Sequence, residues 1–520
     1  MNFISNQFKN YPLRTIMIIA LFVRLLSAIY SKGYGMHDDH FLIIESSKSW
    51  VDGTDFNNWL PQNQEHPKAT GHNLLYIGIH YLLFALFKFL GLSDPQFQML
   101  IIRILHACFS LLIVYYSYRI TKKLSNEETA IKVGLMLALL WFLPFMSVRN
   151  LVEIVSIPLL LAGVWLLIRE SSSNTKLTTY LLAGLIMSVA VSIRYQTLIF
   201  VGGVGLALLF QQKFKEAVMF GIGSILSIAL IQGGIDLLLW GKPFEELKEY
   251  VLYNLKFKNA YGTNNYLMYF EVILGFLIPP VSLFLFFGFF KVWKKHLLLF
   301  LPTILFLAFH TYFPNKQERF IFTIIPFIII LGWIGWNEFV LKSEYWKNHA
   351  KLLKNCYIFF WIINLTILPF VSLSSTKLSR VEAMYALYPD IKNIHAVLID
   401  DSEKIPAVMM PVFYSGKPVM VYSFERGDIP TLGYTNNKSP YLKYINHLDF
   451  FSRNPEAIQP EYVIFTDGKK LNERIEKVKK YFPRLLFIKK IEPSNIDQIM
   501  RKLNPNNKNE EFYIYKTNIK

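Results

Sequence analysis

The sequence predicts an all-α polytopic membrane protein with about 11 transmembrane helices, followed by a C-terminal α/β soluble domain. Of its 520 residues, 53% are hydrophobic and only 18% are charged, and the mean hydropathy is +0.31. Apolar runs of about 20 residues, the length that a helix needs to cross a bilayer, recur over residues 1–374. The segment 375–520 is more polar and alternates short β-like runs with a helical stretch.

The net charge of +17 does not indicate a nucleic-acid partner, because many Lys and Arg lie in short loops between apolar runs. Such loops are cytoplasmic in most membrane proteins. The basic segments 9–14, 119–123, 211–216, 291–295 and 342–354 therefore predict a cytoplasmic N-terminus. The C-terminal domain is then predicted to lie outside, in a periplasm or lumen.

The predicted spans, in chain order, are 14–31, 98–119, 130–148, 150–169, 178–193, 195–211, 216–239, 267–291, 296–311, 319–341 and 355–374. The apolar run 73–91 also resembles a span, but a crossing there would invert the side of every later basic loop. We therefore expect it to lie in the outer interface, within an outer loop over 32–97.

The segment 375–520 contains five β-like runs, at 395–400, 418–424, 461–467, 484–491 and 511–517. A helical stretch at 470–482 lies between them. The alternation predicts a separate α/β domain. Because this domain lacks a Gly-rich phosphate loop, we expect no catalytic role for it.

Polar residues of the membrane part gather at the predicted outer ends of the spans. They are Arg149, Asn150, Glu153, Arg194, Gln196, Asp236, Tyr261, His310, Lys316, Glu318 and Arg319. Charges inside spans are costly and usually face a protein interior or a water-filled cavity. Each could be an interfacial anchor or a structural ion pair, but their concentration on one face favours a shared site.

The first outer loop opens with "GMHDDHFLIIE" (35–45), in which Asp38 and Asp39 stand between His37 and His40. Adjacent residues on a helix diverge by about 100°, so the two carboxylates cannot form one acid/base pair. This favours a single base, with the other carboxylate capping or pairing. His37, Asp39 and His40, with His66 and His72 downstream, also allow a weaker interpretation as a divalent-cation site.

Several segments follow one another in a recognisable order: "HDDH" (37–40), "RNLVEIVSIPL" (149–159), "SVAVSIRYQT" (188–197), "DLLLWGKPF" (236–244) and "HTYFPNKQERF" (310–320). They resemble the H-P-D-E motif, the R-x-x-x-N-x-x-E segment, the span ending in R-P-T, the Asp/Tyr-Gly loop and the H-K-E-x-R-F motif of the Alg9-like and GPI mannosyltransferases. These enzymes are members of the GT-C superfamily. Asp38 and His40 stand where the family has Pro and Glu.

The resemblance implies an inverting glycosyltransferase that moves a sugar, most plausibly mannose, from a polyprenyl-phosphate donor to a glycan or lipid-linked acceptor at the outer face. Asp39 is the implied base, with Asp38 as the alternative. The implied ligands of the lipid phosphate are Arg24, Arg149, Arg194 and Arg319, although Arg24 could instead snorkel to the interface. Further substrate-binding candidates are His37, His40, His66, Lys68, Asn150, Glu153, Gln196, Asp236, Tyr261, His310 and Glu318.

No cofactor is expected to be required, because arginines rather than a metal would offset the phosphate charge. The partners are the donor, the acceptor and the bilayer. Two alternatives remain open from the sequence. One is a lipid-linked glycan transporter or flippase, for which charges near mid-membrane and internal repeats would be expected. The other is a ligase or polymerase of surface polysaccharide, which would share the outer-face site.

Overall fold

A computed structural model describes residues 10–169, 176–259, 265–402, 408–424, 439–445, 447–503 and 510–517. The chain divides into two compact units. Unit 1 contains Met1–Ser31, Gly71–Tyr76 and Arg103–Leu373, and unit 2 contains Lys32–Thr70, Ile77–Ile102 and Ser374–Lys520. The structure thus groups most of the first predicted outer loop with the C-terminal domain, whereas the sequence was divided at residue 374.

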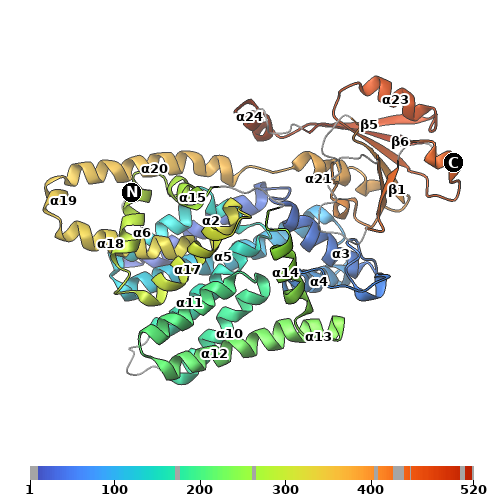
Figure 1. Ribbon diagram of the computed structural model, residues 1–520. Coiled ribbons are helices and arrows are strands. Elements are labelled where there is room, and N and C mark those ends of the chain that lie inside the picture. The colour runs from blue at the N-terminus through green and yellow to red at the C-terminus, as the bar shows by residue number, and fades with distance from the viewer. Residues whose placement is uncertain are drawn as a thin grey trace. The chain divides into compact units, whose positions relative to one another are not determined.

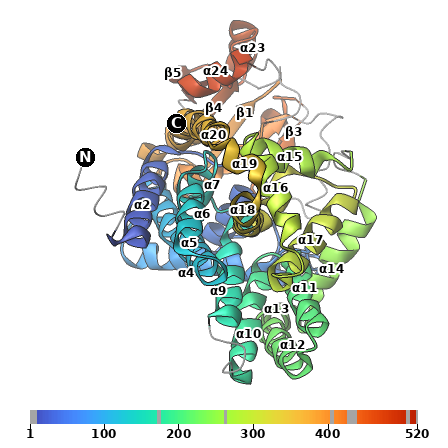
Figure 2. The same ribbon diagram turned by 90° about the vertical axis from the view of Figure 1, so that its left-hand side faces the viewer.

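Unit 1 is helical throughout its described residues (Figure 1). Its elements are α2 (Pro12–Tyr30), α5 (Pro95–Leu124, from Arg103 on), α6 (Glu127–Leu139), α7 (Leu143–Ser147), α8 (Val152–Val155), α9 (Ile157–Ile168), α10 (Leu177–Ile193), α11 (Thr197–Phe210), α12 (Phe214–Ile228), η3 (Ala229–Gly233), α13 (Gly234–Trp240), α14 (Glu245–Lys256), α15 (Met268–Phe276), α16 (Val281–Lys291), α17 (Leu297–Tyr312), η4 (Glu318–Ile324), α18 (Ile325–Lys342), α19 (Glu344–Asn348) and α20 (Ala350–Ser372). Helix α10 lies beside α12, and α11 beside α17 (Figure 2).

Among the described residues, five helical stretches are long and apolar enough to cross a membrane: Pro12–Tyr30, Pro95–Leu124, Phe214–Trp240, Glu318–Lys342 and Ala350–Ser372. Shorter apolar helices cover most of the other predicted spans. The multi-pass membrane character is therefore confirmed, whereas the count of about 11 crossings stays a prediction. Helix α4 (Leu74–Phe89), with 16 residues, is about 24 Å long, which is shorter than the roughly 30 Å hydrocarbon core. Its interfacial placement also stays a prediction.

The predicted span over 267–291 is broken by a sharp bend. Helices α15 and α16 are bent by 117° at the break between them. The break contains Pro279 and Pro280, which cannot donate backbone hydrogen bonds and which clash with the preceding helical turn. Hydropathy over this stretch predicts a span, whereas the bend is indicated only by the proline pair.

The end of α6 shows how unit 1 accommodates a broken helix. The last four carbonyls of a helix lack partners within it. Here Met136 O accepts from the Leu140 N–H at 2.7 Å. Arg24 donates to Leu137 O (3.1 Å) and Ala138 O (3.2 Å). Asn364 donates to Leu139 O at 2.8 Å and accepts from the Trp141 N–H at 2.9 Å. Side chains from α2 and α20 thus provide hydrogen bonds to backbone groups at the end of α6. In an apolar environment, the same groups without partners would cost free energy.

Small residues allow α16 and α18 to pack closely. A Cβ atom added to Gly288 would lie 2.0 Å from Gly332 O, and one added to Gly335 would lie 2.0 Å from Gly288 O. The two backbones therefore approach at a distance that only glycine permits. Packing of this kind drives helix association where lipid removes the usual hydrophobic driving force.

Unit 2 contains the C-terminal domain and most of the first loop. Its elements are η1 (Asp39–Glu45), α3 (Ser46–Val51), η2 (Pro61–Asn63), most of α4, the first turns of α5, α21 (Leu378–Tyr385), η5 (Tyr388–Asp390), β1 (Ala396–Asp400), η6 (Val412–Ser415), β2 (Met420–Phe424), β3 (Leu442–Ile445), α22 (Phe450–Arg453), β4 (Tyr462–Thr466), α23 (Leu471–Lys479), β5 (Leu485–Ile491), α24 (Asn495–Leu503) and β6 (Phe512–Thr517).

The sheet has six strands in the order β3-β2-β1-β4-β6-β5. Strands β3, β2, β1 and β4 are parallel, with Val397 opposite Val421 and Tyr462, while β6 is antiparallel to β4 and β5. Helix α23 covers one face and buries Val478 against the strands (Figure 1). The predicted C-terminal α/β domain is confirmed. The short strand β3 was missed because "LKYI" carries too little apolar periodicity.

Gly33 joins the start of the first loop to the C-terminal domain inside unit 2. It has φ +83° and forms an isolated bridge with Thr376. A Cβ atom at this position would lie 1.8 Å from Thr376 O. Glycine is required here by both the backbone conformation and the close approach.

Candidate active site

The centre of the polar cluster in unit 1 is Glu153, whose side chain is 1% exposed. Its Oε1 pairs with Nη1 of Arg194, and Nε of Arg319 lies 3.7 Å from the same oxygen. Both arginines are also buried, at 5% and 8% exposure. Three outer turns that the sequence placed on one face thus supply one compact group of charges.

The local fold explains why these three side chains meet. Glu153 lies in the short helix α8, and its own carbonyl accepts from Thr323 Oγ1 at 3.3 Å, which ties α8 to η4. Arg194 follows the last residue of α10 and has an extended backbone (φ −146°, ψ 106°). Arg319 is the second residue of η4. Each side chain therefore emerges from a helix end.

Aromatic rings line the cluster. The Phe320 ring lies 5.3 Å from the guanidinium carbon of Arg194 and 5.7 Å from that of Arg319. The ring of His310 lies 6.1 Å from that of Phe320 and 6.4 Å from that of Tyr269. Cation–π contacts hold guanidinium groups without using their hydrogen-bond donors. Among the described residues, Arg194 keeps N–H donors without a partner, whereas Nε of Arg319 donates to Gln317 Oε1 at 2.8 Å.

The cluster has more positive than negative charge. One buried carboxylate faces two buried guanidinium groups, and burying an uncompensated charge is costly. Among the described residues, no hydrogen-bond partner is found for Nε and Nη2 of Arg194 or for Nε2 of His310. Buried polar groups are normally satisfied, so such a group of atoms calls for an explanation. A bound anion would provide both the charge and the acceptors.

The neighbouring candidates differ in exposure. Arg149 and Asn150 are buried just before α8, with the Arg149 guanidinium 4.4 Å from the Phe145 ring centre. Gln196 is half-buried at the start of α11, and Glu318 is exposed. Lys316 is buried and donates to Phe313 O at 2.9 Å. Tyr261 lies outside the described residues.

Arg24 is a structural residue, which corrects its assignment as a phosphate ligand. It is completely buried. Its Nε donates to Ser110 Oγ at 3.0 Å, and its terminal nitrogens donate to carbonyls at the end of α6. Each of the three guanidinium nitrogens therefore already donates to a protein acceptor.

Asp236 also has a structural contact set, whereas the sequence analysis assigned it to substrate. It is completely buried, accepts from Gln232 Nε2 at 2.9 Å, and accepts from the Glu246 N–H at 3.0 Å. Glu246 in turn accepts from the backbone N–H groups of Gly71 (2.6 Å) and His72 (3.1 Å). Glu246 was not among the predicted site residues, because it is one of three glutamates in the loop 240–266 and nothing in the sequence distinguishes it from the other two.

The carboxylate pair lies in unit 2 at the start of η1. Asp39 is 5% exposed, and its Oδ2 accepts from the Met36 N–H at 3.0 Å. Asp38 is half-buried. The bond to Met36 fixes the orientation of the Asp39 carboxylate.

Element η1 is a π-helix, in which backbone bonds join residues i and i+5. This geometry places His40 above Glu45, and the two side chains meet at 3.1 Å. Both oxygens of Glu45 accept from the Phe413 N–H, at 2.9 and 3.0 Å. The His40 ring stacks between those of Tyr34 (4.9 Å) and Tyr414 (5.5 Å). His40 is 1% exposed, so its position indicates a structural role and not substrate contact.

The other candidates of this loop are more open. His37 stacks on Phe41 at 4.4 Å, and burial lowers the pKa of His37 to about 4. His66 and Lys68 are exposed. In the part of the chain that the structure describes, no group of three His, Cys, Asp or Glu side chains is arranged to hold a metal ion.

The sequence profile of the Alg9-like mannosyltransferase family matches residues 15–411. GPI mannosyltransferase 3 of Yarrowia lipolytica is 23% identical over 368 residues, which are 68% of this chain and 68% of that protein. GPI mannosyltransferase 3 of Debaryomyces hansenii is 24% identical over 151 residues, 28% of this chain and 26% of that protein.

The fold is similar to that of ArnT from Cupriavidus metallidurans, solved bound to undecaprenyl phosphate. The two share 12% sequence identity and a TM-score of 0.60, over 96% of this chain and 97% of that chain. The family match covers all five segments that carried the resemblance, from "HDDH" to "HTYFPNKQERF". The chain therefore belongs to the Alg9-like mannosyltransferase family, and it is an integral, multi-pass membrane glycosyltransferase of the GT-C fold.

Proposed function

We propose that this enzyme transfers mannose from a polyprenyl-phosphate donor to a glycan or lipid-linked acceptor at the outer face of the membrane, with inversion at the anomeric carbon. The observation that carries the proposal is the buried cluster of Arg194 and Arg319 around the single carboxylate of Glu153. The family and its GPI mannosyltransferase relatives support mannose as the sugar. The basic-loop pattern supports the outer face.

The cluster suits the phosphate of a lipid carrier. Guanidinium groups remain charged at any physiological pH and present planar donor pairs that match phosphate oxygens. Glu153 holds one edge of Arg194 and leaves Nε and Nη2 without partners among the described residues. ArnT, which has a similar fold, was solved bound to undecaprenyl phosphate. A phosphate between the two arginines would supply the missing negative charge.

In the proposed reaction, an acceptor hydroxyl oxygen attacks C1 of mannose as the C1–O bond to the phosphate breaks. Asp39 takes the hydroxyl proton, and the polyprenyl phosphate leaves with the bonding electrons. Arg194 and Arg319 stabilise the charge that develops on this phosphate. Asp39 is preferred to Asp38 because the Met36 N–H orients its carboxylate. No metal is required in this scheme, since the arginines act on the leaving group.

The test is transfer of labelled mannose from polyprenyl-phosphate-mannose by the purified enzyme to a panel of mannose-terminated glycolipids and oligosaccharides. Parallel reactions offer a polyprenyl-pyrophosphate glycan as the donor. Transfer of mannose from the monophosphate donor is expected. Transfer of the whole glycan from the pyrophosphate carrier, with no mannose transfer, would instead identify a polysaccharide ligase.

Two further arms of the assay test the roles of the loop. Asp39→Asn is nearly isosteric, and loss of a positioned base should lower turnover by roughly 10²–10⁴-fold, whereas Asp38→Asn should retain more activity. The opposite result would identify Asp38 as the base. Full activity in both variants would show that neither carboxylate takes part in the reaction. EDTA should leave wild-type activity intact. Loss restored by Mg²⁺ or Mn²⁺ would contradict the metal-free scheme.

A further inference from the structure

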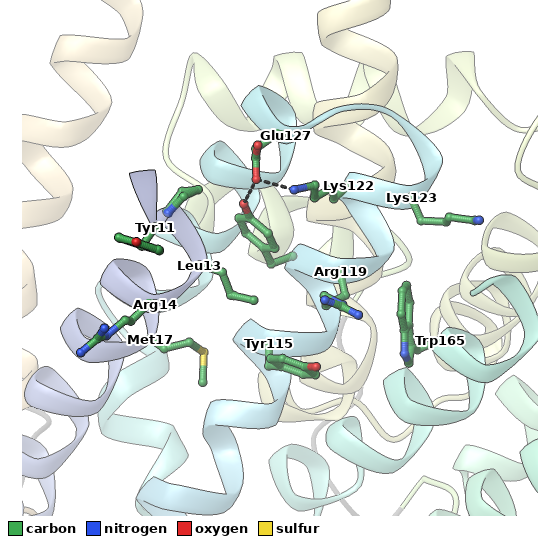
Figure 3. A pocket seen from close by; sticks show the side chains of 12 residues that line it. Tyr11, Leu13, Arg14, Met17, Tyr115, Arg119, Lys122, Lys123, Glu127 and Trp165 are labelled. Atoms are coloured by element: carbon green, nitrogen blue, oxygen red, sulfur yellow. Dashed lines mark hydrogen bonds and ion pairs between the residues drawn. The ribbon is translucent and has the colours of Figure 1, made fainter. Parts of the chain in front are cut away.

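A second, separate site opens among the helix ends of unit 1 (Figure 3). It is a pocket of about 640 Å³, within the roughly 300–1,000 Å³ typical of small-molecule sites. It contains none of the residues of the candidate active site. Its lining comes from the start of α2, the end of α5, the start of α6 and α9: Tyr11, Pro12, Leu13, Arg14, Met17, Tyr115, Tyr118, Arg119, Lys122, Lys123, Glu127 and Trp165.

The charges of this pocket are unbalanced. Four basic side chains line it against one carboxylate, Glu127. Glu127 is already engaged, because it accepts from Tyr118 Oη at 2.9 Å and from Lys122 Nζ (Figure 3). For Arg14, Arg119 and Lys123, the described residues provide no carboxylate partner. Three cations without a counter-charge therefore line the pocket, with Arg119 in the middle and with Arg14 and Lys123 extending outward at opposite edges (Figure 3).

Aromatic rings hold the central cation in place. The guanidinium carbon of Arg119 lies 5.0 Å from the Trp165 ring centre and 5.8 Å from that of Tyr115. As in the active-site cluster, stacking positions the guanidinium while leaving its N–H donors for another partner. Met17 and Leu13 on α2 add an apolar wall beside the charges (Figure 3).

The pocket lies where a membrane interface is expected. Helix α5 has 30 residues and is about 45 Å long, which exceeds the roughly 30 Å hydrocarbon core. Its last turn carries Lys122 and Lys123, so these residues extend into the headgroup layer. The start of α2 lies at the same end of the pair of helices, the end that the basic-loop pattern assigns to the cytoplasm. Trp and Tyr are enriched at this level of a membrane.

We propose that this pocket binds the phosphate headgroup of an anionic phospholipid from the cytoplasmic leaflet. Arg119 would contact the phosphate oxygens, Arg14 and Lys123 at the two edges of the pocket would attract the anionic headgroup through their charge, and the acyl chains would follow the apolar wall of α2. Cytoplasmic leaflets are rich in anionic lipids, and basic pockets between spanning helices are suited to their headgroups. The proposal is independent of the sugar donor and of the reaction proposed above.

Native mass spectrometry of the full-length protein in detergent tests this proposal. The probes are phosphatidylglycerol, phosphatidylcholine with the same acyl chains, and inorganic phosphate. Wild type should retain one phosphatidylglycerol with an affinity at least roughly 10-fold above that for phosphatidylcholine. Equal retention of the two lipids, or displacement of phosphatidylglycerol by inorganic phosphate at equal concentration, would overturn the assignment to an anionic lipid.

Variants locate the lipid in the pocket. Arg14 and Lys123 are exposed, so Arg14→Gln with Lys123→Gln should fold normally and lose roughly 10-fold or more in affinity for phosphatidylglycerol. Arg119→Gln, which changes a different residue of the same pocket, should also lower the affinity for phosphatidylglycerol by roughly 10-fold or more. The control is Lys213→Gln with Lys215→Gln, which removes two charges from another loop predicted on the same side. Wild-type binding in the pocket variants, or an equal loss in the control, would refute the site.

Discussion

Arg194→Lys is the most direct perturbation of the proposed phosphate cluster. The substitution keeps one positive charge beside Glu153 but replaces the planar guanidinium by a single ammonium group. In the structure, Arg194 uses Nη1 on Glu153 and lies over the Phe320 ring, while Nε and Nη2 have no partner among the described residues. A lysine can pair with Glu153 or with a phosphate, but its compact head cannot bridge both with comparable geometry.

The expected magnitude follows from the loss of one charge-assisted hydrogen bond to the leaving phosphate. Such a bond contributes about 1.5–3 kcal/mol, and each ~1.4 kcal/mol is a factor of ten in rate. We therefore expect kcat/KM for the polyprenyl-phosphate donor to fall by roughly 10- to 150-fold. Because the charge on the phosphate increases as the C1–O bond breaks, kcat should fall and not only the affinity for the donor.

The assay measures initial rates of mannose transfer over a range of donor concentrations, alongside thermal unfolding of the same preparations. Arg24→Lys is the matched control, since Arg24 is equally buried but donates to Ser110 Oγ and to carbonyls at the end of α6. It should lower the unfolding temperature and leave kcat/KM per folded enzyme unchanged. Wild-type kcat/KM in Arg194→Lys, or an equal catalytic loss in Arg24→Lys, would refute the assignment.

Other regions of the molecule lead to four further predictions. Glu45→Gln should lower the free energy of unfolding by about 1.5–3 kcal/mol, because bonds to a charged acceptor are lost; an unchanged denaturation midpoint would contradict this. Burial lowers the pKa of His37 to about 4. Between about pH 6.5 and 4, His37 is therefore protonated in the unfolded chain but not in the folded protein. Stability should therefore decline as pH falls through that window, less so in His37→Gln. Gly335→Val should separate α16 from α18 and cost about 1–3 kcal/mol or more, seen as a lower unfolding temperature, whereas Gly275→Ala, with open space at its Cβ, should be mild. Cysteines placed at 125 and 472 should be labelled from opposite sides of the membrane, and labelling from one side only would contradict the predicted topology.

The sequence predicted the elements whose pattern is local. The strands β1, β2, β4, β5 and β6 were recognised from short apolar runs, and the membrane character from composition. The sharp bend between α15 and α16 was missed because a hydropathy average does not register two prolines. The break after α6 was also missed. Its stability depends on Arg24 and Asn364, which are distant in sequence, and local patterns do not contain such contacts.

The candidate site was predicted only in part, because local sequence patterns do not contain contacts between distant residues. Hydropathy identifies a buried arginine as costly and therefore significant, but it does not say which acceptors surround it. Arg24 and Arg194 were equivalent on this criterion. The structure separates them, since the donors of Arg24 are used by carbonyls and a hydroxyl, whereas Arg194 keeps donors without a protein partner among the described residues. The two arginines therefore differ in whether their N–H donors have protein acceptors, and not in how deeply they are buried.

The π-helix after the carboxylate pair gives a physical reason for a C-terminal domain that carries none of the proposed catalytic residues. An α-helix would align residues three and four apart, and Glu45 would then lie off the face that His40 occupies. The π-helix brings these two residues together, and Glu45 in turn accepts from the backbone of Phe413 in the C-terminal domain. The stack of Tyr34, His40 and Tyr414 extends the same contact. The π-helix, the buried contact between His40 and Glu45 and the contact with the C-terminal domain thus involve the same residues. Asp39 is the first residue of this π-helix, so the C-terminal domain contacts the same element that carries the proposed base.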